Sequence, residues 1–166
     1  MKDSPSYNSL HKILCATKTI ACIGVSANTM RPSHFVARYM HYRGYRVISV
    51  NPSQAGNRLF GEVVRGDLSG LANKNMDMIN IFCRPKFVPT ILDEVLKYLR
   101  PQLKIVWMQI GVQNEEAAEK AKNHDLNVIQ NRYPKNEYQR LFGELRKAGF
   151  NTGNIASRLC IRPQHA

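Results

Sequence analysis

The stretch Ile20-Ala21-Cys22-Ile23-Gly24-Val25-Ser26, which continues as Ala27-Asn28-Thr29-Met30-Arg31-Pro32-Ser33, decides the fold of this chain. An apolar run of strand length ends at a glycine, and a proline followed by a serine then marks the start of a helix. Backbone N–H groups converge in such a turn, and the helix dipole adds partial positive charge there. The stretch therefore predicts a phosphate-binding loop, and an anionic, nucleotide-like ligand is the leading interpretation.

Strand-like and helix-like segments alternate along the rest of the chain. Short apolar runs bounded by turn residues predict strands at residues 19–25, 45–50, 77–83, 104–108 and 127–129. Capping residues and apolar positions at helical spacing predict helices at residues 9–17, 33–43, 88–99 and 114–122. Residues 59–64 are expected to add a short edge piece. The alternation predicts an α/β protein with a single Rossmann-like, doubly wound parallel sheet of about five strands and helices on both faces.

A single domain is expected, because 166 residues with 43% hydrophobic side chains can form one well-buried core but not two. Residues 1–8 are expected to be a flexible N-terminus, residues 9–158 the domain, and residues 159–166 a C-terminal tail. The four cysteines, at positions 15, 22, 83 and 160, stand far apart without metal-ligand spacing. Reduced thiols, the lack of a signal peptide and the lack of a membrane-spanning run together predict a cytoplasmic protein without a membrane partner.

The chain carries 24 basic and 12 acidic side chains, which gives a formal net charge of +12. Such a charge attracts polyanions, whether phosphorylated ligands, nucleic acid or acidic membrane surfaces. The basic residues are scattered from Lys2 to Arg162 and form no Lys/Arg block of the kind found in nucleic-acid-binding arms. This dispersal disfavours nucleic acid, and a mixed, solvated basic surface explains the charge equally well.

The first candidate site is the loop itself, with residues Gly24, Val25, Ser26, Arg31, Pro32 and Ser33. In an open parallel sheet, ligands bind at the carboxyl ends of the strands, near the point where the strand order reverses. The hydroxyls of Ser26, Thr29 and Ser33 can each contact a phosphate, and Arg31 can add a bidentate charged contact. Alternatively, Ser33 only caps the following helix and Pro32 only starts it. The loop lacks the glycines of a dinucleotide fingerprint.

The ends of the other strands supply the remaining candidate residues, which are Asn51, Pro52, Cys83, Arg84, Pro85, Gln109 and Gly111. An NAD-binding sheet usually ends its second strand with an acidic residue for the ribose hydroxyls. Asn51 and Pro52 stand there instead, where they can contact a sugar or base or simply start a turn. Arg84 suits either a phosphate or a surface ion pair, and Gln109 can bind an amide chain.

No catalytic set emerges from the pattern. The five histidines are dispersed, and the loops show neither paired carboxylates nor a Ser/His/Asp arrangement. His34 is the only histidine near the inferred site, and an exposed or capping role is expected for it. No catalytic residue and no metal site are therefore predicted.

Five segments carry a resemblance to a known family: GVSANTMRPS (24–33), VNPS (50–53), FCRP (82–85), WMQIGVQNEEAAEKA (107–121) and NRYPKNEYQRLFGEL (131–145). In this order they resemble the small stand-alone CoA-binding proteins, whose Rossmann-like fold is that of the nucleotide-binding domain of the succinyl-CoA synthetase alpha subunit. The resemblance runs from about Thr17 to Arg158. It implies that the loop from Gly24 to Ser33 holds the phosphates of coenzyme A.

The resemblance also implies that Asn51-Pro52 and Cys83-Arg84-Pro85 flank the ADP moiety, and that Gln109 and Gly111 line the next part of the cleft. Asn131 and Tyr133 depart from the family, which more often carries an acid before Arg132 and a cysteine after it. A thiol-based function at that segment is therefore not expected. Ligase activity of the chain alone is not expected either, because the synthetase needs a further domain with a phosphorylated histidine.

The expected function is that of a module that binds coenzyme A or an acyl-CoA without a recognisable catalytic centre. The alternative is an NAD(P)-using oxidoreductase or a subunit of an acyl-CoA ligase or transferase. Nucleic-acid binding is a third and less favoured reading. The physiological role, the acyl group and the oligomeric state, whether a homo-oligomer or a complex with a partner subunit, stay open at this point.

Overall fold

Five parallel strands form the central sheet of the computed structural model, which describes residues 5–144. They are β1 (Thr19–Ile23), β2 (Arg46–Val50), β5 (Met78–Ile81), β6 (Ile105–Met108) and β7 (Asn127–Ile129). Their order across the sheet is β2-β1-β5-β6-β7, and every neighbouring pair is parallel. The predicted α/β class is confirmed.

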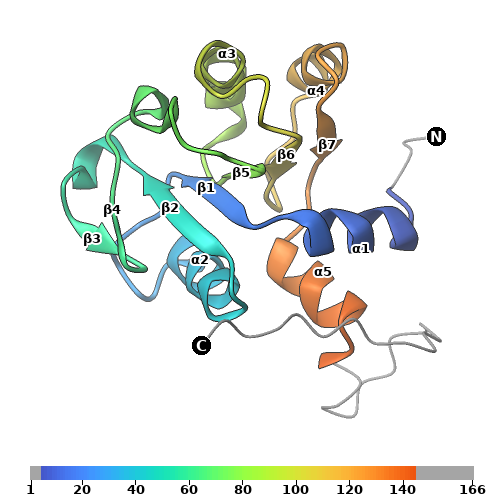
Figure 1. Ribbon diagram of the computed structural model, residues 1–166, viewed down its shortest axis with the longest axis horizontal. Helices are drawn as coiled ribbons and strands as arrows, with labels where there is room; N and C mark the ends of the chain where they lie inside the picture. The colour runs from blue at the N-terminus through green and yellow to red at the C-terminus, as the bar shows by residue number, and fades with distance from the viewer. Residues whose placement is uncertain (1–4, 145–166) are drawn as a thin grey trace.

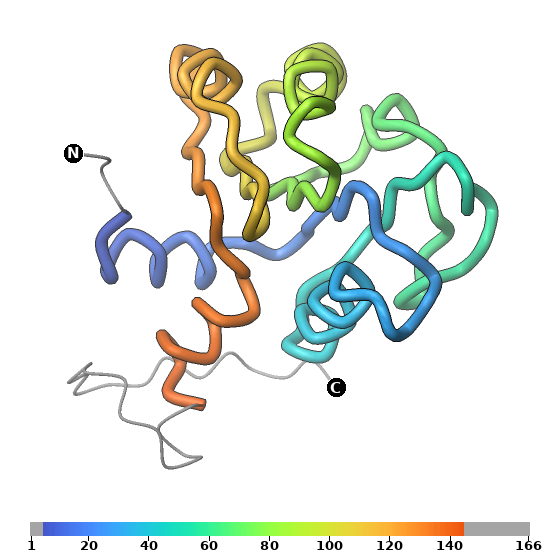
Figure 2. Tube along the Cα trace, turned by 180° about the vertical axis from the view of Figure 1, so that it is seen from behind, coloured from blue at the N-terminus to red at the C-terminus, as the bar shows by residue number. Residues whose placement is uncertain are grey.

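Helices cover both faces of this sheet (Figures 1 and 2). One face carries α3 (Val88–Tyr98) and α4 (Glu115–Lys122), and the other carries α1 (Tyr7–Ala16), α2 (Pro32–Tyr42) and α5 (Pro134–Leu141). Successive side chains of a strand point to opposite faces, so each strand contributes to two cores. In β1, Ala21 and Ile23 belong to the core beneath α3 and α4. Ile20 and Cys22 belong to the core beneath the other three helices.

The strand order reverses between β1 and β5. From β1 the chain crosses to β2 on one side, whereas β5, β6 and β7 follow on the other side. The segments that leave β1 and β5 therefore start from neighbouring strands and diverge above and below the sheet. Such a reversal leaves room for a ligand at the carboxyl ends of the strands.

A small hairpin and three short 3-10 helices complete the described part of the chain. The hairpin strands are β3 (Arg58–Leu59) and β4 (Glu62–Val63), and the 3-10 helices are η1 (Pro52–Gln54), η2 (Leu68–Leu71) and η3 (Pro85–Phe87). The expected edge piece at residues 59–64 is thus a separate antiparallel hairpin. An isolated parallel bridge between Val50 and Arg65 and the ion pair between Arg46 and Glu62 join this region to β2 of the main sheet.

Several predicted boundaries differ from those in the structure. Helix α1 is capped by Ser6, whose hydroxyl accepts the N–H of Ser9 at 3.2 Å, so Ser9 is not the cap. Strand β5 ends at Ile81, which leaves Cys83 in the segment after the strand. Residues 1–4 and 145–166, which hold half of the expected flexible N-terminus and the whole expected C-terminal tail, lie outside the described residues.

Cys15, Cys22 and Cys83 form no disulfide with one another, and Cys160 lies outside the described residues. None of the helices within residues 5–144 is long and apolar enough to cross a membrane.

A row of polar side chains is buried across the middle of the sheet. Ser49, Cys22 and Asn80 are register partners on β2, β1 and β5, and all three are almost fully buried. Burial raises the pKa of the Cys22 thiol to about 12, although a hydrogen bond with Asn80 partly offsets this effect. The folded protein therefore keeps Cys22 protonated at a pH where an unfolded chain ionises it.

We expect Cys22 to make the protein more sensitive to alkali. Because its pKa is raised in the folded state, its contribution is complete below pH 9 and is lost as the pH rises toward 12. In that window the free energy of unfolding should fall by about 1.4 kcal/mol per pH unit on account of this group. Urea denaturation at pH 8 and pH 10.5 should show a smaller loss for Cys22→Ala than for the wild type. Equal losses in both proteins would contradict the assignment.

Candidate functional site

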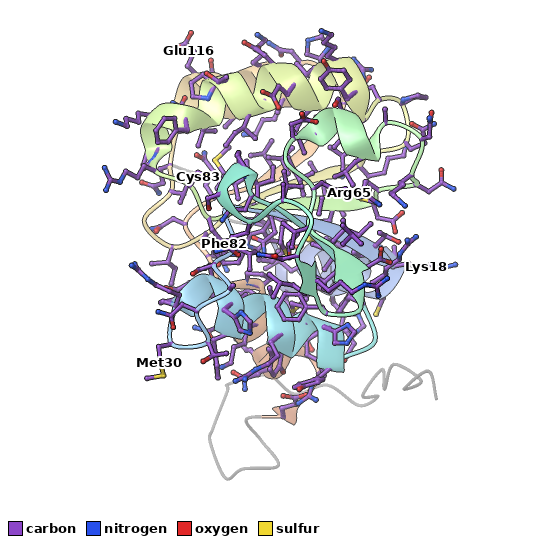
Figure 3. The ribbon with its side chains drawn as sticks, turned by 90° about the vertical axis from the view of Figure 1, so that its left-hand side faces the viewer. Lys18, Met30, Arg65, Phe82, Cys83 and Glu116 are labelled. Atoms are coloured by element: carbon purple, nitrogen blue, oxygen red, sulfur yellow. The ribbon has the colours of Figure 1, made fainter. Side chains whose placement is uncertain are left out.

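The candidate site lies at the carboxyl edge of the sheet, where the segments after β1, β2, β5 and β6 begin. Figure 3 shows Phe82, Cys83 and Met30 on this side of the molecule, whereas Lys18, which precedes β1, lies on the opposite side. The structure thus brings the predicted loop at residues 24–33 to the same edge as the predicted segment at 83–85. Side chains on the two segments can face one ligand.

The turn after β1 is shaped by Gly24. Its φ angle is +87°, in the left-handed region that glycine adopts without strain, and its N–H donates to the carbonyl of Val50 at 2.9 Å. A Cβ atom at this position would lie 2.9 Å from the Sγ of Cys83. The close approach of β1 and β5 at their carboxyl ends therefore depends on the missing side chain.

Replacement of Gly24 by alanine should destabilise the protein by about 2–3 kcal/mol, from left-handed backbone strain plus the clash with Cys83. Gly61→Ala is the matched control, because Gly61 has a φ of +80° and nothing within 4 Å of the added Cβ. It should cost about 1 kcal/mol. Urea denaturation measures both variants. Equal losses would show that the contact with Cys83 does not matter.

Side-chain oxygens in and next to the loop accept hydrogen bonds from several backbone N–H groups of this turn. The N–H of Ser26 donates to the hydroxyl oxygen of Ser33 at 3.2 Å, and the N–H of Asn28 donates to the hydroxyl oxygen of Ser26 at 3.1 Å. The N–H of Met30 donates to Oδ1 of Asn28 at 2.9 Å. Each serine oxygen acts as an acceptor here, so each hydroxyl retains its own hydrogen for donation to a ligand.

Helix α2 begins at Pro32, and Arg31 occupies the cap position without a side-chain cap hydrogen bond. Ser33 is therefore not the helix cap. It lies in the first turn of the helix, and its hydroxyl oxygen accepts the hydrogen bond from Ser26 in the loop. Arg31 and Pro32 are exposed, and Ser33 is half-buried. The first N–H groups of a helix have no acceptor within the helix. The first turn of α2 therefore offers hydrogen-bond donors and the positive end of the helix dipole at the carboxyl edge of the sheet.

His34 is buried, which corrects the expectation of an exposed or capping residue. Its Nδ1 lies 2.9 Å from the carbonyl oxygen of Ser26, and its ring lies 5.2 Å from that of Phe60 in the hairpin. Sequence spacing gave no sign of these contacts, because both partners lie outside the helix that carries His34. The histidine thus holds the loop after β1 against the first turn of α2.

Asn51 ties the ends of β1 and β2 together. Its Nδ2 donates to the carbonyl of Val25 at 2.9 Å, and its Oδ1 accepts the N–H of Ser53 at 3.1 Å. The side chain thus caps η1, as the turn interpretation predicted. Val25 is buried, whereas Pro52 is exposed at the edge.

Three exposed cations, Arg31, Arg84 and Lys86, lie in the segments after β1 and β5. None of them forms an ion pair with another residue in the range 5–144, so the ion-pair alternative for Arg84 finds no partner there. No acidic residue occurs in the sequence between residues 4 and 61, between 78 and 92, or between 95 and 114. The loops directly after β1, β2, β5 and β6 therefore carry cations and no carboxylates, whereas Glu115 and Glu116 stand in the first turn of α4, just beyond the β6 loop.

Cys83 and Pro85 lie beside these cations. Cys83 is half-buried, with its Sγ 3.9 Å from the carbonyl oxygen of Ile23, and burial raises the pKa of its thiol. The group therefore stays a neutral thiol near pH 7, which does not suit a nucleophile. Pro85 is exposed and begins η3.

After β6, Gln109 is buried and Gly111 is exposed. The side-chain amide of Gln109 donates to Oδ1 of Asn80, which leaves Oε1 of Gln109 buried without a partner among residues 5–144. Gly111 has a φ of +82°, and its N–H donates to Oδ1 of Asn131 at 2.9 Å. Asn131, one of the departures noted in the sequence, thus holds the β6 turn in place.

Residues 18–139 match the model of a family described as a CoA binding domain. The matched segment covers most of the chain, including all five strands of the sheet. The chain belongs to this family of CoA-binding domains. The resemblance noted in the sequence is thereby confirmed.

Several other proteins are similar to this chain over most of their length. An uncharacterized protein of Bacillus subtilis (strain 168), YneT, is 32% identical over 126 residues, which are 76% of this chain and 89% of that protein. A solved structure from Thermus thermophilus is 35% identical, covers 82% of this chain and 99% of its own, and has a TM-score of 0.77. A hypothetical protein from Pyrococcus horikoshii OT3 is 27% identical, with coverage of 83% and 93% and a TM-score of 0.75.

Two features of the CoA-binding domain were missed by sequence reasoning. The first is the hydrogen bond of 2.8 Å from the indole N–H of Trp107 on β6 to the carbonyl of Arg132. The second is the ion pair of 2.9 Å between Arg132 and Glu137. Together they hold the segment after β7 against the sheet, although an Asn-Arg-Tyr-Pro sequence alone signals only a turn before a helix.

Proposed function

We propose that this chain is a cytoplasmic module that binds coenzyme A or an acyl-CoA across the carboxyl edge of its sheet. The family of CoA-binding domains supports the ligand class. The observation that carries the choice of surface is the lack of carboxylates in the loops directly after β1, β2, β5 and β6, together with the exposed cations Arg31, Arg84 and Lys86. Coenzyme A carries a pyrophosphate and a ribose 3′-phosphate, which such an edge complements.

In this proposal the pyrophosphate lies at the loop of residues 24–33. The free hydroxyl hydrogens of Ser26 and Ser33 and the first turn of α2 donate to it, and Arg31 and Arg84 neutralise it. Asn51 keeps the β1 and β2 ends at a fixed distance beside the ADP moiety, and Pro52 and Pro85 present apolar surface there. Gly111 lines the path of the pantetheine amides, and buried Gln109 supports this segment from within the sheet through its hydrogen bond to Asn80.

The same geometry favours binding over catalysis. His34, the histidine nearest the loop, is buried and engaged with the carbonyl of Ser26. Cys83 is kept as a neutral thiol by burial. Neither group is arranged as a nucleophile with an adjacent base, which covalent or acid–base catalysis requires.

Isothermal titration of the full chain tests the proposal with CoA, 3′-dephospho-CoA, NAD⁺ and NADH as ligands. CoA is expected to bind more tightly than 3′-dephospho-CoA, because the 3′-phosphate adds charge that the cationic edge attracts. NAD⁺ and NADH should bind weakly, since no carboxylate follows β2 to hold the ribose hydroxyls. Tight NAD(H) binding without CoA binding, or NADPH turnover that is lost in Arg31→Ala, would overturn the proposal in favour of an oxidoreductase.

A further inference from the structure

Most of the large apolar side chains that are exposed lie in or next to the segments that form the candidate site. Within residues 5–144, five of them are exposed: Met30 (88%), Tyr42 (65%), Ile110 (49%), Phe87 (48%) and Phe35 (46%). Four of the five, all except Tyr42, lie in the segments after β1, β5 and β6 or in the first turn of α2. Single exposed apolar residues are ordinary on any protein surface, and Phe35 lies beside Lys135 of α5, whose ammonium is 5.4 Å from the ring centre. Phe87 and Ile110, in the segments after the neighbouring strands β5 and β6, are the two that bear on the site.

The apolar residues are unevenly placed along this edge. In the order of the strands across the sheet, the segments after β2, β1, β5 and β6 are residues 51–57, 24–31, 82–87 and 109–114. The first of these contains Asn51, Pro52, Ser53, Gln54, Ala55, Gly56 and Asn57, without one large apolar side chain. Phe87 and Ile110 belong to the last two, which leave the neighbouring strands β5 and β6.

We infer that the ligand of this edge is an acyl-CoA with an apolar acyl chain, and that the chain lies against Phe87 and Ile110. The inference rests on the proposed function. If the phosphates lie at the loops after β1 and β5, with the ADP moiety beside Asn51, the pantetheine arm runs toward β6. Its acyl end then reaches the apolar part of the edge, whereas the opposite direction offers only polar side chains.

The backbone that carries both apolar residues is fixed by hydrogen bonds before any ligand arrives. The N–H of Phe87 donates to the carbonyl of Arg84 at 3.0 Å within η3, and the ammonium of Lys86 lies 4.9 Å from the centre of the Phe87 ring. Ile110 stands between buried Gln109 and Gly111, and the N–H of Val112 donates back to the carbonyl of Gln109 at 2.9 Å. A preformed surface loses little freedom when a ligand covers it.

The proposed contact predicts how affinity depends on chain length. Full burial of a methylene group increases affinity by up to about fourfold, and a surface that covers one side of the chain should give about twofold. A short acyl-CoA such as acetyl-CoA should therefore bind about as well as CoA. Each further methylene group should then raise the affinity by about twofold until the acyl chain covers the side chains of Phe87 and Ile110.

Isothermal titration of the full chain with CoA and with acetyl-, butyryl-, hexanoyl- and octanoyl-CoA measures this dependence. The wild type should gain about twofold in affinity per methylene, and Phe87→Ser and Ile110→Ser should each flatten the series. Tyr42→Ser is the matched control, because Tyr42 is exposed but lies at the end of α2 far from the first turn. It should retain the wild-type series.

The outcomes separate this inference from the proposed function. Equal affinity for CoA and all acyl-CoAs would overturn the inference and leave CoA binding intact. A chain-length dependence that survives both serine substitutions would also overturn it, because the acyl chain would then lie elsewhere. If neither CoA nor any acyl-CoA binds, the proposed function fails as well.

Discussion

Replacement of Arg31 and Arg84 together by alanine is expected to weaken CoA binding by about 100-fold. A charge-assisted hydrogen bond contributes about 1.5 kcal/mol or more, so the loss of two such contacts corresponds to about 3 kcal/mol. The fold should be unaffected, because both side chains are exposed and neither forms an ion pair within residues 5–144. Titration calorimetry at two salt concentrations measures the effect.

The matched control removes the same charge from the opposite edge of the sheet. Lys104 precedes β6 and Lys122 ends α4, and both are exposed. The Lys104→Ala/Lys122→Ala double variant should bind CoA within about threefold of the wild type, because exposed charges at that range are largely screened by salt. If both double variants lose affinity equally, net charge rather than the candidate site governs binding.

Trp107→Ala is expected to lower the free energy of unfolding by about 3–5 kcal/mol. Trp107 is fully buried in the middle of β6, where it contacts the core beneath α1, α2 and α5. Its removal leaves a large cavity and also deprives the carbonyl of Arg132 of its donor. Since Trp107 is the only tryptophan, circular dichroism during urea denaturation, rather than fluorescence, is the suitable measurement.

Trp107→Phe separates the two contributions and serves if the alanine variant does not fold. Phenylalanine keeps an aromatic ring in the core but loses the indole N–H, so the loss should be about 1–2 kcal/mol. The segment after β7 should then loosen more than the sheet, which hydrogen exchange of residues 131–133 can detect. Equal losses in both variants would contradict the cavity estimate.

The sheet could be predicted from the sequence because all five strands are short apolar runs bounded by turn residues. The boundaries were less certain, since Ser6 and Ser9 are equivalent caps in sequence and only the path of the backbone selects Ser6. Helix α5 was missed by the pattern of apolar residues. Of its eight residues, only Pro134, Tyr138 and Leu141 are buried, which is too sparse a signal for helical periodicity.

Part of the candidate site could likewise be predicted from the sequence, and part of it could not. The residues that follow strands could be assigned to one edge, because carboxyl ends of parallel strands share an edge. The contacts of Ser33 and His34 with Ser26 could not be predicted, since they join a helix to the preceding loop through side-chain geometry. Ile110 became a candidate contact for the acyl chain only because its side chain is exposed, and the sequence alone does not show which side chains are exposed.

The absence of carboxylates between residues 4 and 61 has a consequence for how the protein is made. During synthesis, β1, α2 and β2 leave the ribosome as a wholly cationic unit. Arg46 of this unit can pair with Glu62 soon afterwards. The backbone N–H groups of Lys18 and Thr19 find their acceptor only once Asp77 has been synthesised. Arg43 finds its ion-pair partner only with Glu144. The amino-terminal half therefore gains its full set of opposite charges only when nearly all of the polypeptide has been translated.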